Sequence, residues 1–362
     1  MSTIPITQSQ LRPPPIKEQF VRRSKLNKKL IHIPKYPLTL LYAGAGYGKS
    51  TALSLFAHDL NTDICWYTLS QNDDDILPFL TKLIQSIKQN HSFFGNKIQE
   101  ELEELDNYIT IEKVYSLASS FINEIMSLEE SVILILDDFH HVKHSTEIEK
   151  WMLFVLQHIP SNLHMVVSSR NRPEWDVMSK YKIKGDLLEI TQRDLTLSPA
   201  EMNFILEDMH QLNMSDEDVA KIHTLTEGWT IAFNMLVQQL HTETSVETIF
   251  LNRQKSLEDL FDYLAHEVLS KQSLIIQQFL MQSSIMEVLS PEVCDHVLQI
   301  NGSEEILAGL VKQNLFIEEG EGNYYRYHAL FKAFLENLLL LKHENEYNTL
   351  HMVCVKFFSV PL

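Results

Sequence analysis

Residues 38–50 read LTLLYAGAGYGKS. The first part, LTLLY, is a short apolar run that follows a proline, which is typical of a buried strand. Residues 49–60 carry their apolar side chains at helical spacing. A strand, a glycine-rich loop and a helix in this order are the local context that a phosphate-binding loop requires. The sequence therefore predicts a fold built around such a loop at residues 43–50.

The loop AGAGYGKS matches the pattern G-x-x-x-x-G-K-[ST], with Ala43 in place of the first glycine. Its glycines let the backbone curl, so that N–H groups point at phosphate oxygens, and the dipole of the next helix adds to this attraction. Lys49 is expected to bridge the β- and γ-phosphates and Ser50 to ligate magnesium through its hydroxyl group. The alternative is a flexible glycine loop with an incidental lysine, which the strand–loop–helix context disfavours. The predicted nucleotide-binding residues of the loop are Gly44, Ala45, Gly46, Tyr47, Gly48, Lys49, Ser50 and Thr51.

A second magnesium anchor is expected where another apolar strand ends in an acid. Residues 132–138 read VILILDD, so Asp137 joins Ser50 as a predicted metal ligand. Asp138 is predicted to orient or deprotonate the attacking water. Arg170 follows the strand predicted at 163–168, and we expect it to sense the γ-phosphate. Asp138 and Arg170 are the candidate catalytic residues; the alternatives are acids that merely end a strand and an ordinary surface arginine.

Further strand-like runs alternate with helical segments through the first half of the chain, which predicts a parallel sheet with right-handed crossovers. The pattern changes after residue 190. The segment Ser198-Pro199-Ala200-Glu201 has the composition of a helix start, and helical patterns follow to about 240 and again over 258–343. Two β-prone runs, LFIEE and YYRYH, interrupt the second stretch in the manner of a winged helix. The predicted strands are 38–42, 64–69, 131–136, 163–168 and 187–190.

Composition limits the classes of protein to which the chain can belong. Its 362 residues suggest two or three domains, since a domain usually has about 150 residues. Hydrophobic residues make up 44% of the chain and charged residues 22%, which is typical of a globular protein. The formal charge of −18 disfavours nucleic-acid binding over the whole surface, because an acidic surface repels phosphates. The exception is a basic stretch near the start, which we expect to face nucleotide phosphates or solvent: Arg12, Lys17, Arg22, Arg23, Lys25, Lys28, Lys29 and Lys35, with Glu18 as its one acid.

Targeting signals are absent from the pattern. The first residues lack the apolar core of a signal peptide, and no apolar run approaches the roughly 20 residues that span a bilayer. Three widely separated cysteines suggest neither a disulfide framework nor a zinc site. The sequence therefore predicts a cytoplasmic protein that does not contact a membrane.

With these elements in order, the chain resembles the MalT-like, LuxR-associated members of the STAND class of signal-transduction ATPases. The motifs that carry the resemblance are LRPP, VRRSKL, AGAGYGKST, CWYTLSQND, ILILDDFHHV, VVSSRNRP, LLEITQRDLTLSPAE, TEGWTIAFNML, FDYLAHEVL, NLFIEE and YYRYHALF. The resemblance implies an α/β P-loop NTPase domain with a parallel sheet, followed by an α-helical lid domain and a winged-helix domain. The predicted boundaries are 1–190, 191–255 and 256–362, the last part including the start of a truncated helical region.

The resemblance also implies roles for single residues. Arg23 matches an arginine near the nucleotide, and Trp229, after Gly228, matches the lid-domain motif. His328 matches the winged-helix histidine that touches the β-phosphate of ADP and holds the resting state closed. The alternative for His328 is a histidine partly buried in a hydrophobic core.

The expected function is that of a regulatory module that is closed with ADP, opens to self-associate with ATP, and is reset by slow ATP hydrolysis with Mg²⁺. Relatives continue into a helical array that binds an inducer and a helix-turn-helix that binds DNA, so both contacts are expected only through domains absent from these residues. Two alternatives remain: a non-enzymatic adaptor or truncated regulator that holds a nucleotide, and, with less support, a metabolic P-loop kinase.

Overall fold

The computed structural model describes residues 5–17, 20–60, 63–103, 109–241 and 257–359. The chain divides into two compact units. The first comprises Met1–Ala43 and Gly48–Leu195, and the second comprises Gly44–Tyr47 and Thr196–Leu362. The tip of the predicted phosphate loop is thus grouped with the C-terminal part of the chain. The predicted boundary between residues 255 and 256 lies outside the described residues.

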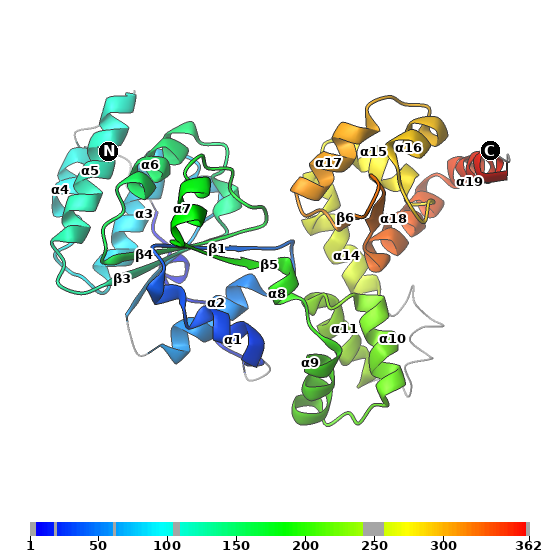
Figure 1. Cartoon of the computed structure of the whole chain (residues 1–362), viewed down its shortest axis with the longest axis horizontal. Helices are drawn as coiled ribbons and strands as arrows, with labels where there is room; N and C mark the ends of the chain where they lie inside the picture. The colour runs from blue at the N-terminus through cyan, green and yellow to red at the C-terminus, as the bar shows by residue number, and fades with distance from the viewer. Residues whose placement is uncertain (1–4, 18–19, 61–62, 104–108, 242–256, 360–362) are drawn as a thin grey trace. The chain divides into compact units, whose positions relative to one another are not determined.

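The first unit is built on a five-stranded sheet in the order β2-β3-β4-β1-β5 (Figure 1). All four pairings are parallel, as the alternation of strands and helices predicted. The loop strand β1 is not paired with β3, because β4 lies between them. The residue that follows β4 therefore lies between the phosphate loop and the acidic pair. The strands are β1 (Leu38–Tyr42), β2 (Ile64–Thr68), β3 (Val132–Asp137), β4 (Leu163–Ser169) and β5 (Leu187–Thr191).

Helices cover both faces of this sheet, which explains why β3 is apolar from Val132 to Leu136. Alternate strand residues such as Leu134 and Met165 join one hydrophobic core with the large helices. Their neighbours Ile135 and Val166 are equally buried on the opposite face, where α1 and α2 lie (Figure 1). The helices of the first core are α3 (Ile76–Lys88), α4 (Asn96–Glu103), α5 (Ile111–Met126), α6 (Thr146–Gln157) and α7 (Met178–Lys184), and those of the other face are α1 (Ser24–Leu30) and α2 (Lys49–Asp59). A short helix, α8 (Gln192–Leu195), ends the unit.

The part of the second unit that the structure describes is helical, with one small hairpin. Its first helix starts as predicted: Ser198 caps the helix and exchanges bonds with Glu201 in a capping box, with proline at the first turn. The two β-prone runs form the antiparallel pair β6 (Ile317–Glu319) and β7 (Tyr325–Tyr327). The helices are α9 (Pro199–Phe204), α10 (Asp216–Thr226), α11 (Thr230–Leu240), α14 (Glu258–Glu267), α15 (Leu274–Ser283), α16 (Pro291–Leu298), α17 (Ser303–Lys312), α18 (Ala329–Lys342) and α19 (Glu344–Ser359).

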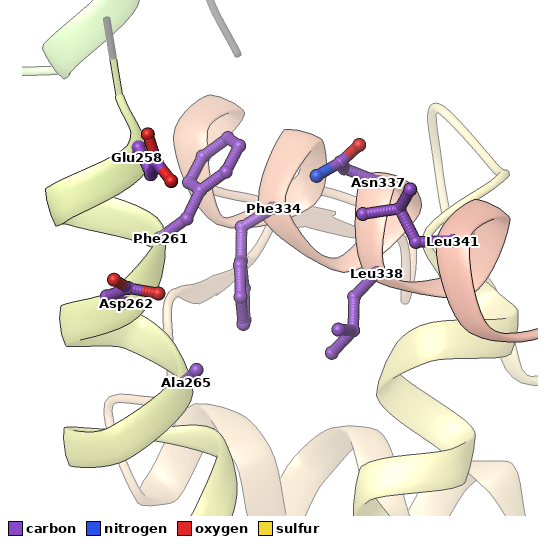
Figure 2. A pocket seen from close by; sticks show the side chains of 8 residues that line it. All are labelled: Glu258, Phe261, Asp262, Ala265, Phe334, Asn337, Leu338 and Leu341. Atoms are coloured by element: carbon purple, nitrogen blue, oxygen red, sulfur yellow. The ribbon is translucent and has the colours of Figure 1, made fainter. Parts of the chain in front are cut away.

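A groove of about 450 Å³ lies between α14 and α18 (Figure 2). Phe261 and Phe334 pack against each other there, with ring centroids 5.6 Å apart, and Glu258 and Asp262 stand at one edge. None of the residues that line it belongs to the predicted nucleotide site.

Within the described residues, no helix has both the length and the apolar character needed to cross a bilayer.

Candidate nucleotide-binding site

Lys49 is the first residue of α2, and burial makes its charge costly. The helix starts after Gly48, whose φ of 79° lies in the left-handed region that glycine adopts without strain. Only 7% of Lys49 is exposed, and its Nζ donates a hydrogen bond to the Ala43 carbonyl at 2.9 Å. Burial lowers the pKa of Lys49 to about 8, although Asp138 and Asp137 act in the opposite direction. The lysine is thus a desolvated cation that an anion would stabilise.

Asp137, the last residue of β3, is 1% exposed. Burial and the neighbouring Asp138 raise the pKa of Asp137, while the hydroxyl groups of Ser50 and Ser168 and the charge of Lys49 lower it. Its Oδ1 has no hydrogen-bond partner among the described residues. A buried carboxylate oxygen without a partner, next to the Ser50 hydroxyl, fits a site for a hard divalent cation such as Mg²⁺, which takes few protein ligands and completes its shell with water and phosphate.

Asp138 has an unusual backbone conformation. Its φ of 58° and ψ of 38° are left-handed, which non-glycine residues adopt rarely and often at functional sites. One of its carboxylate oxygens lies 3.7 Å from Nδ1 of His140. Burial, together with the charge of Arg170, lowers the pKa of His140 to about 2, so this histidine is neutral and the contact is not an ion pair.

Arg170 directly follows β4, in the position between the loop strand and β3. Its charge lowers the pKa values of both Lys49 and His140, so it lies near both. Arg172, two residues further on, is instead held by Glu189, with 2.8 Å between Nε and Oε1. Arg170 is therefore the arginine of this segment that lies near Lys49, and its role as a sensor of the γ-phosphate stays a prediction.

The tip of the loop contacts α11 and the turn before it, within the second unit. Nε1 of Trp229 donates to the Ala45 carbonyl at 2.8 Å, and the amide of Ile231 donates to the Gly46 carbonyl at 3.1 Å. A Cβ atom on Gly46 would lie 2.6 Å from the Ile231 side chain, so only glycine fits there. Both bonds engage carbonyl oxygens, whereas phosphate binding uses backbone N–H groups, so the two kinds of contact do not compete.

Trp229 is fully buried in this arrangement. Its ring lies 6.4 Å from that of Tyr47, 4.7 Å from that of Phe316 and 5.6 Å from the imidazole of His328. Trp229 therefore joins the loop tip to the hairpin region of the second unit. The predicted contact between its side chain and the nucleotide stays a prediction.

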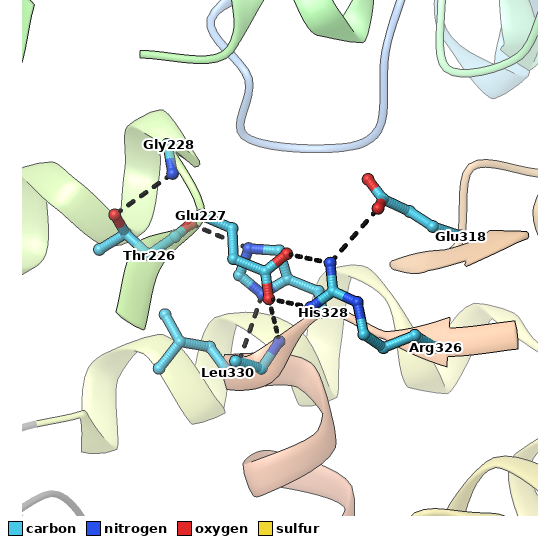
Figure 3. Close-up of polar contacts among 8 residues, drawn as sticks. Thr226, Glu227, Gly228, Glu318, Arg326, His328 and Leu330 are labelled. Carbon is cyan, nitrogen blue, oxygen red and sulfur yellow. Dashed lines mark hydrogen bonds and ion pairs between the residues drawn. The ribbon is translucent and has the colours of Figure 1, made fainter. Parts of the chain in front are cut away.

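His328 uses both ring nitrogens within the second unit (Figure 3). Its Nε2 donates to the Thr226 carbonyl at 2.9 Å, and Nδ1 accepts from the amide of Leu330 at 3.3 Å, which caps α18. Burial lowers the pKa of His328, and the nearby Glu227 opposes that shift. The neutral tautomer with a proton on Nε2 satisfies both bonds. Contact with a β-phosphate, which also stays a prediction, would exchange the bond to Thr226 for one to the phosphate.

Arg23, in the N-terminal segment, ties that segment to the end of the first unit. Its guanidinium group donates to the carbonyls of Leu195 at 2.6 Å and Asp194 at 3.3 Å. Lys29 forms an ion pair with Asp194 at 2.6 Å. Part of the basic stretch thus pairs with acids and carbonyls of its own unit, and the predicted place of Arg23 near a nucleotide is not tested by these contacts.

Comparison with known proteins adds an independent line of observation. Residues 265–347 match the family model described as the MalT winged helix domain. The resemblance to MalT-like regulators is confirmed. The chain is 28% identical over 320 residues to the HTH-type transcriptional regulator MalT of Vibrio parahaemolyticus, with 87% of this chain aligned, and 27% identical over 325 residues to MalT of Klebsiella pneumoniae, with 88% aligned. The chain spans about 35% of the length of these relatives.

Among solved structures, the chain is similar to the Walker-type ATPase PABY2304 of Pyrococcus abyssi. The TM-score is 0.59 at 14% identity, with 87% of this chain and 95% of that chain covered. At this identity the similarity concerns the fold. The predicted class, a parallel-sheet P-loop NTPase domain followed by helical regions and a MalT-type winged helix, is thereby confirmed.

Sequence reasoning missed some residues that the structure places at these sites. Ser168 ends the strand predicted at 163–168 and had no predicted role, although its hydroxyl group lowers the pKa of Asp137. Glu227 and Arg326 lie inside the quoted motifs TEGW and YYRYH, but their pairing across 99 residues leaves no local signal. Their charge was the one local clue in these motifs, and a charge alone does not show which residue it pairs with.

Proposed function

We propose that this chain is the nucleotide-controlled module of a MalT-like transcriptional regulator, closed with ADP and opening to self-associate with ATP. One observation carries the proposal. Lys49 and Asp137 are both buried at the carboxyl end of one parallel sheet, and each has a pKa shifted towards its neutral form. Perturbed charges in a phosphate-loop context are typical of a ligand site.

The residues of the first unit would divide the work of binding. Lys49 and the helix N-terminus attract phosphate, while Ser50 and Asp137 would hold Mg²⁺, which neutralises phosphate charge when it is bound. Asp138 and Arg170 would act on turnover: the carboxylate orients or deprotonates water, and the guanidinium stabilises charge on the terminal phosphate.

The residues of the second unit would report which nucleotide is present. Trp229 and Ile231 already bind the loop tip, and His328 lies 5.6 Å from the Trp229 ring. A β-phosphate contact from His328 would favour ADP in the closed state to the extent that ADP binds that state better than the open one. Inducer and DNA contacts of the longer relatives would belong to parts outside these residues.

An assay of Asp138→Asn tests the catalytic part. The substitution keeps the size of the side chain and removes its charge, so we expect ATP to remain bound while hydrolysis falls and the self-associated form accumulates. Binding is measured by calorimetry, phosphate release by a continuous assay, and assembly by light scattering. Hydrolysis at the wild-type rate would assign the water-orienting role to another residue.

The same assays separate the alternatives. Transfer of phosphate to a small acceptor would support a metabolic kinase. Tight ADP binding with no hydrolysis and no change of assembly would support an adaptor that holds the nucleotide structurally.

A further inference from the structure

The turn at residues 226–229 is a meeting point within the second unit. Its four residues bond to three different segments of the chain. The partners, in order, are His328 for the carbonyl of Thr226, Arg326 and the amide of Ala329 for the carboxylate of Glu227, the amide of Leu197 for the carbonyl of Gly228, and the carbonyl of Ala45 for the ring of Trp229. A shift of this turn would therefore change its bonds to the loop tip and to the segment that follows the hairpin.

Glu227 occupies the critical place in the turn. Its φ of 48° is left-handed, a conformation that glutamate adopts rarely and that the surrounding contacts must stabilise. Gly228 follows with a φ of 76°, and a Cβ atom there would lie 2.5 Å from the Leu197 carbonyl. Two successive left-handed residues make a tight bend, which brings Trp229 to the loop tip.

The Glu227 side chain supplies those contacts (Figure 3). Its two oxygens accept from the two Nη atoms of Arg326 at 2.8 and 3.0 Å, and Oε1 also accepts from the amide of Ala329 at 2.9 Å. That amide belongs to the first turn of α18, where a negative charge also meets the positive end of the helix dipole. Burial of Glu227 acts to raise its pKa, but the bonds from Arg326 and from the amide of Ala329 outweigh it and leave the pKa lowered.

Arg326 couples this carboxylate to the hairpin. It lies on β7, two residues before His328. The planar guanidinium group binds both oxygens of Glu227 at once, which fixes direction as well as distance. The ion pair therefore sets where the turn lies relative to the histidine.

We propose that Glu227 and Arg326 are the positioning pair of the nucleotide switch. They hold the turn so that Trp229 engages the loop tip and His328 stands ready to exchange the Thr226 carbonyl for a phosphate oxygen. The proposal rests on the proposed ADP-bound closed state. Both residues act through Trp229 and His328.

Glu318 provides a matched control. It contacts the same guanidinium group at 3.4 Å from β6, but 65% of its side chain is exposed and it lies outside the turn. Glu227→Gln and Glu318→Gln each remove one negative charge near Arg326. Only the first should disturb the turn.

The experiment measures ADP release by stopped flow for Glu227→Gln, Glu318→Gln, Arg326→Gln and the double variant Glu227→Gln/Arg326→Gln. We expect Glu227→Gln and Arg326→Gln each to release ADP about tenfold faster, and Glu318→Gln to stay within about twofold of wild type. Because the two partners act as one unit, the double variant should release ADP no more than about twofold faster than either single variant. Arg326→Lys keeps the charge without the fork, and should fall between wild type and Arg326→Gln.

Hydrogen exchange at the first turn of α18 in nucleotide-free protein supplies a readout that does not depend on ADP. Faster exchange in Glu227→Gln than in Glu318→Gln is expected. Faster exchange with an unchanged ADP release rate would show that the pair only stabilises the helix, and would overturn the positioning role while leaving the proposed function intact. A wild-type protein that binds no ADP would overturn both, and equal release rates for Glu227→Gln and Glu318→Gln would overturn the pair alone.

Discussion

The phosphate loop and the turn at 226–229 treat buried charge in opposite ways. At the loop, burial shifts the pKa of Lys49 down and that of Asp137 up, so both ionised forms are costly. At the turn, the pKa of Glu227 is lowered by its partners, and the neutral ring of His328 is bonded at both nitrogens. Buried polar groups in folded proteins are normally paired. At the loop, Oδ1 of Asp137 has no hydrogen-bond partner among the described residues, which is typical of a ligand site. At the turn, Glu227 and His328 are paired, which is typical of a structural joint.

This contrast has a thermodynamic consequence. Buried charged residues that bind a ligand lower the free energy of unfolding of the ligand-free protein, and ligand binding raises it again by mass action. Residues that hold a joint stabilise the state in which they are paired. Substitutions in the two regions should therefore move stability and binding in different combinations.

The largest expected effect is that of His328→Ala. Losing one hydrogen bond to a charged phosphate costs about 1.5–3 kcal/mol, which shifts a two-state equilibrium roughly ten- to a hundredfold. We expect faster ADP release and easier opening, measured by stopped flow with Trp229 fluorescence as reporter. If His328 only packs in the core, the melting temperature falls while the ADP release rate stays at the wild-type value.

Lys49→Ala should weaken ATP binding at least tenfold, or about 1.4 kcal/mol, because a charge-assisted contact to phosphate is lost. Lys180→Ala, which removes an exposed lysine of α7 in the same unit, is the control and should leave affinity unchanged. Calorimetry that finds equal ATP affinity for wild type and Lys49→Ala would refute the assignment of the loop.

A weaker effect is expected on pH dependence. The pKa of Lys49 is lowered to about 8, so its cationic form is present below that pH and is lost as the pH rises through it. Phosphate binding favours the cation, so ADP affinity should fall by up to about tenfold between pH 7 and pH 9, with proton uptake near pH 8. Calorimetry in buffers of different ionisation enthalpy measures the uptake. Its absence, or its persistence in Lys49→Ala, would contradict the prediction.

The smallest expected effect concerns stability alone. Because the pKa of Asp137 is raised in the folded protein, the nucleotide-free fold loses stability as the pH rises from the pKa of the unfolded aspartate to that of the folded one, and the full loss remains at higher pH. Asp137→Asn should therefore increase the free energy of unfolding at pH 7 by about 1 kcal/mol, a usual size for one substitution, while abolishing the effect of Mg²⁺ on nucleotide affinity. Ser54→Ala, which changes a buried polar residue of α2, is the control for the effect of any polar substitution in the core. A less stable Asp137→Asn protein would show that the carboxylate serves the fold.

Local sequence patterns were enough to predict most of this architecture. Continuous apolar runs gave the five strands, because a sheet covered on both faces needs them, and Ser198 with Glu201 gave the start of α9. Strand order was not readable, since the insertion of β4 between β1 and β3 depends on long-range pairing.

The two candidate regions differ in the same respect. Lys49 and Ser50 were predicted from the spacing of the phosphate-loop pattern, and Asp137 was predicted from its place at the end of an apolar strand. Glu227 and Arg326 were missed because their bonds join residues 99 positions apart. A loop pattern or the end of a strand marks such residues locally, whereas the three-dimensional structure is needed to find bonds between distant segments.

The nucleotide content of the purified protein tests the central claim most directly. Protein is denatured after gel filtration and the released nucleotides are separated by chromatography, for wild type, Lys49→Ala and Lys180→Ala. We expect ADP at close to one molecule per chain in wild type and Lys180→Ala, or uptake to that level after incubation with ADP and Mg²⁺, and clearly less in Lys49→Ala. A wild-type protein that neither carries nor takes up adenine nucleotide would contradict it.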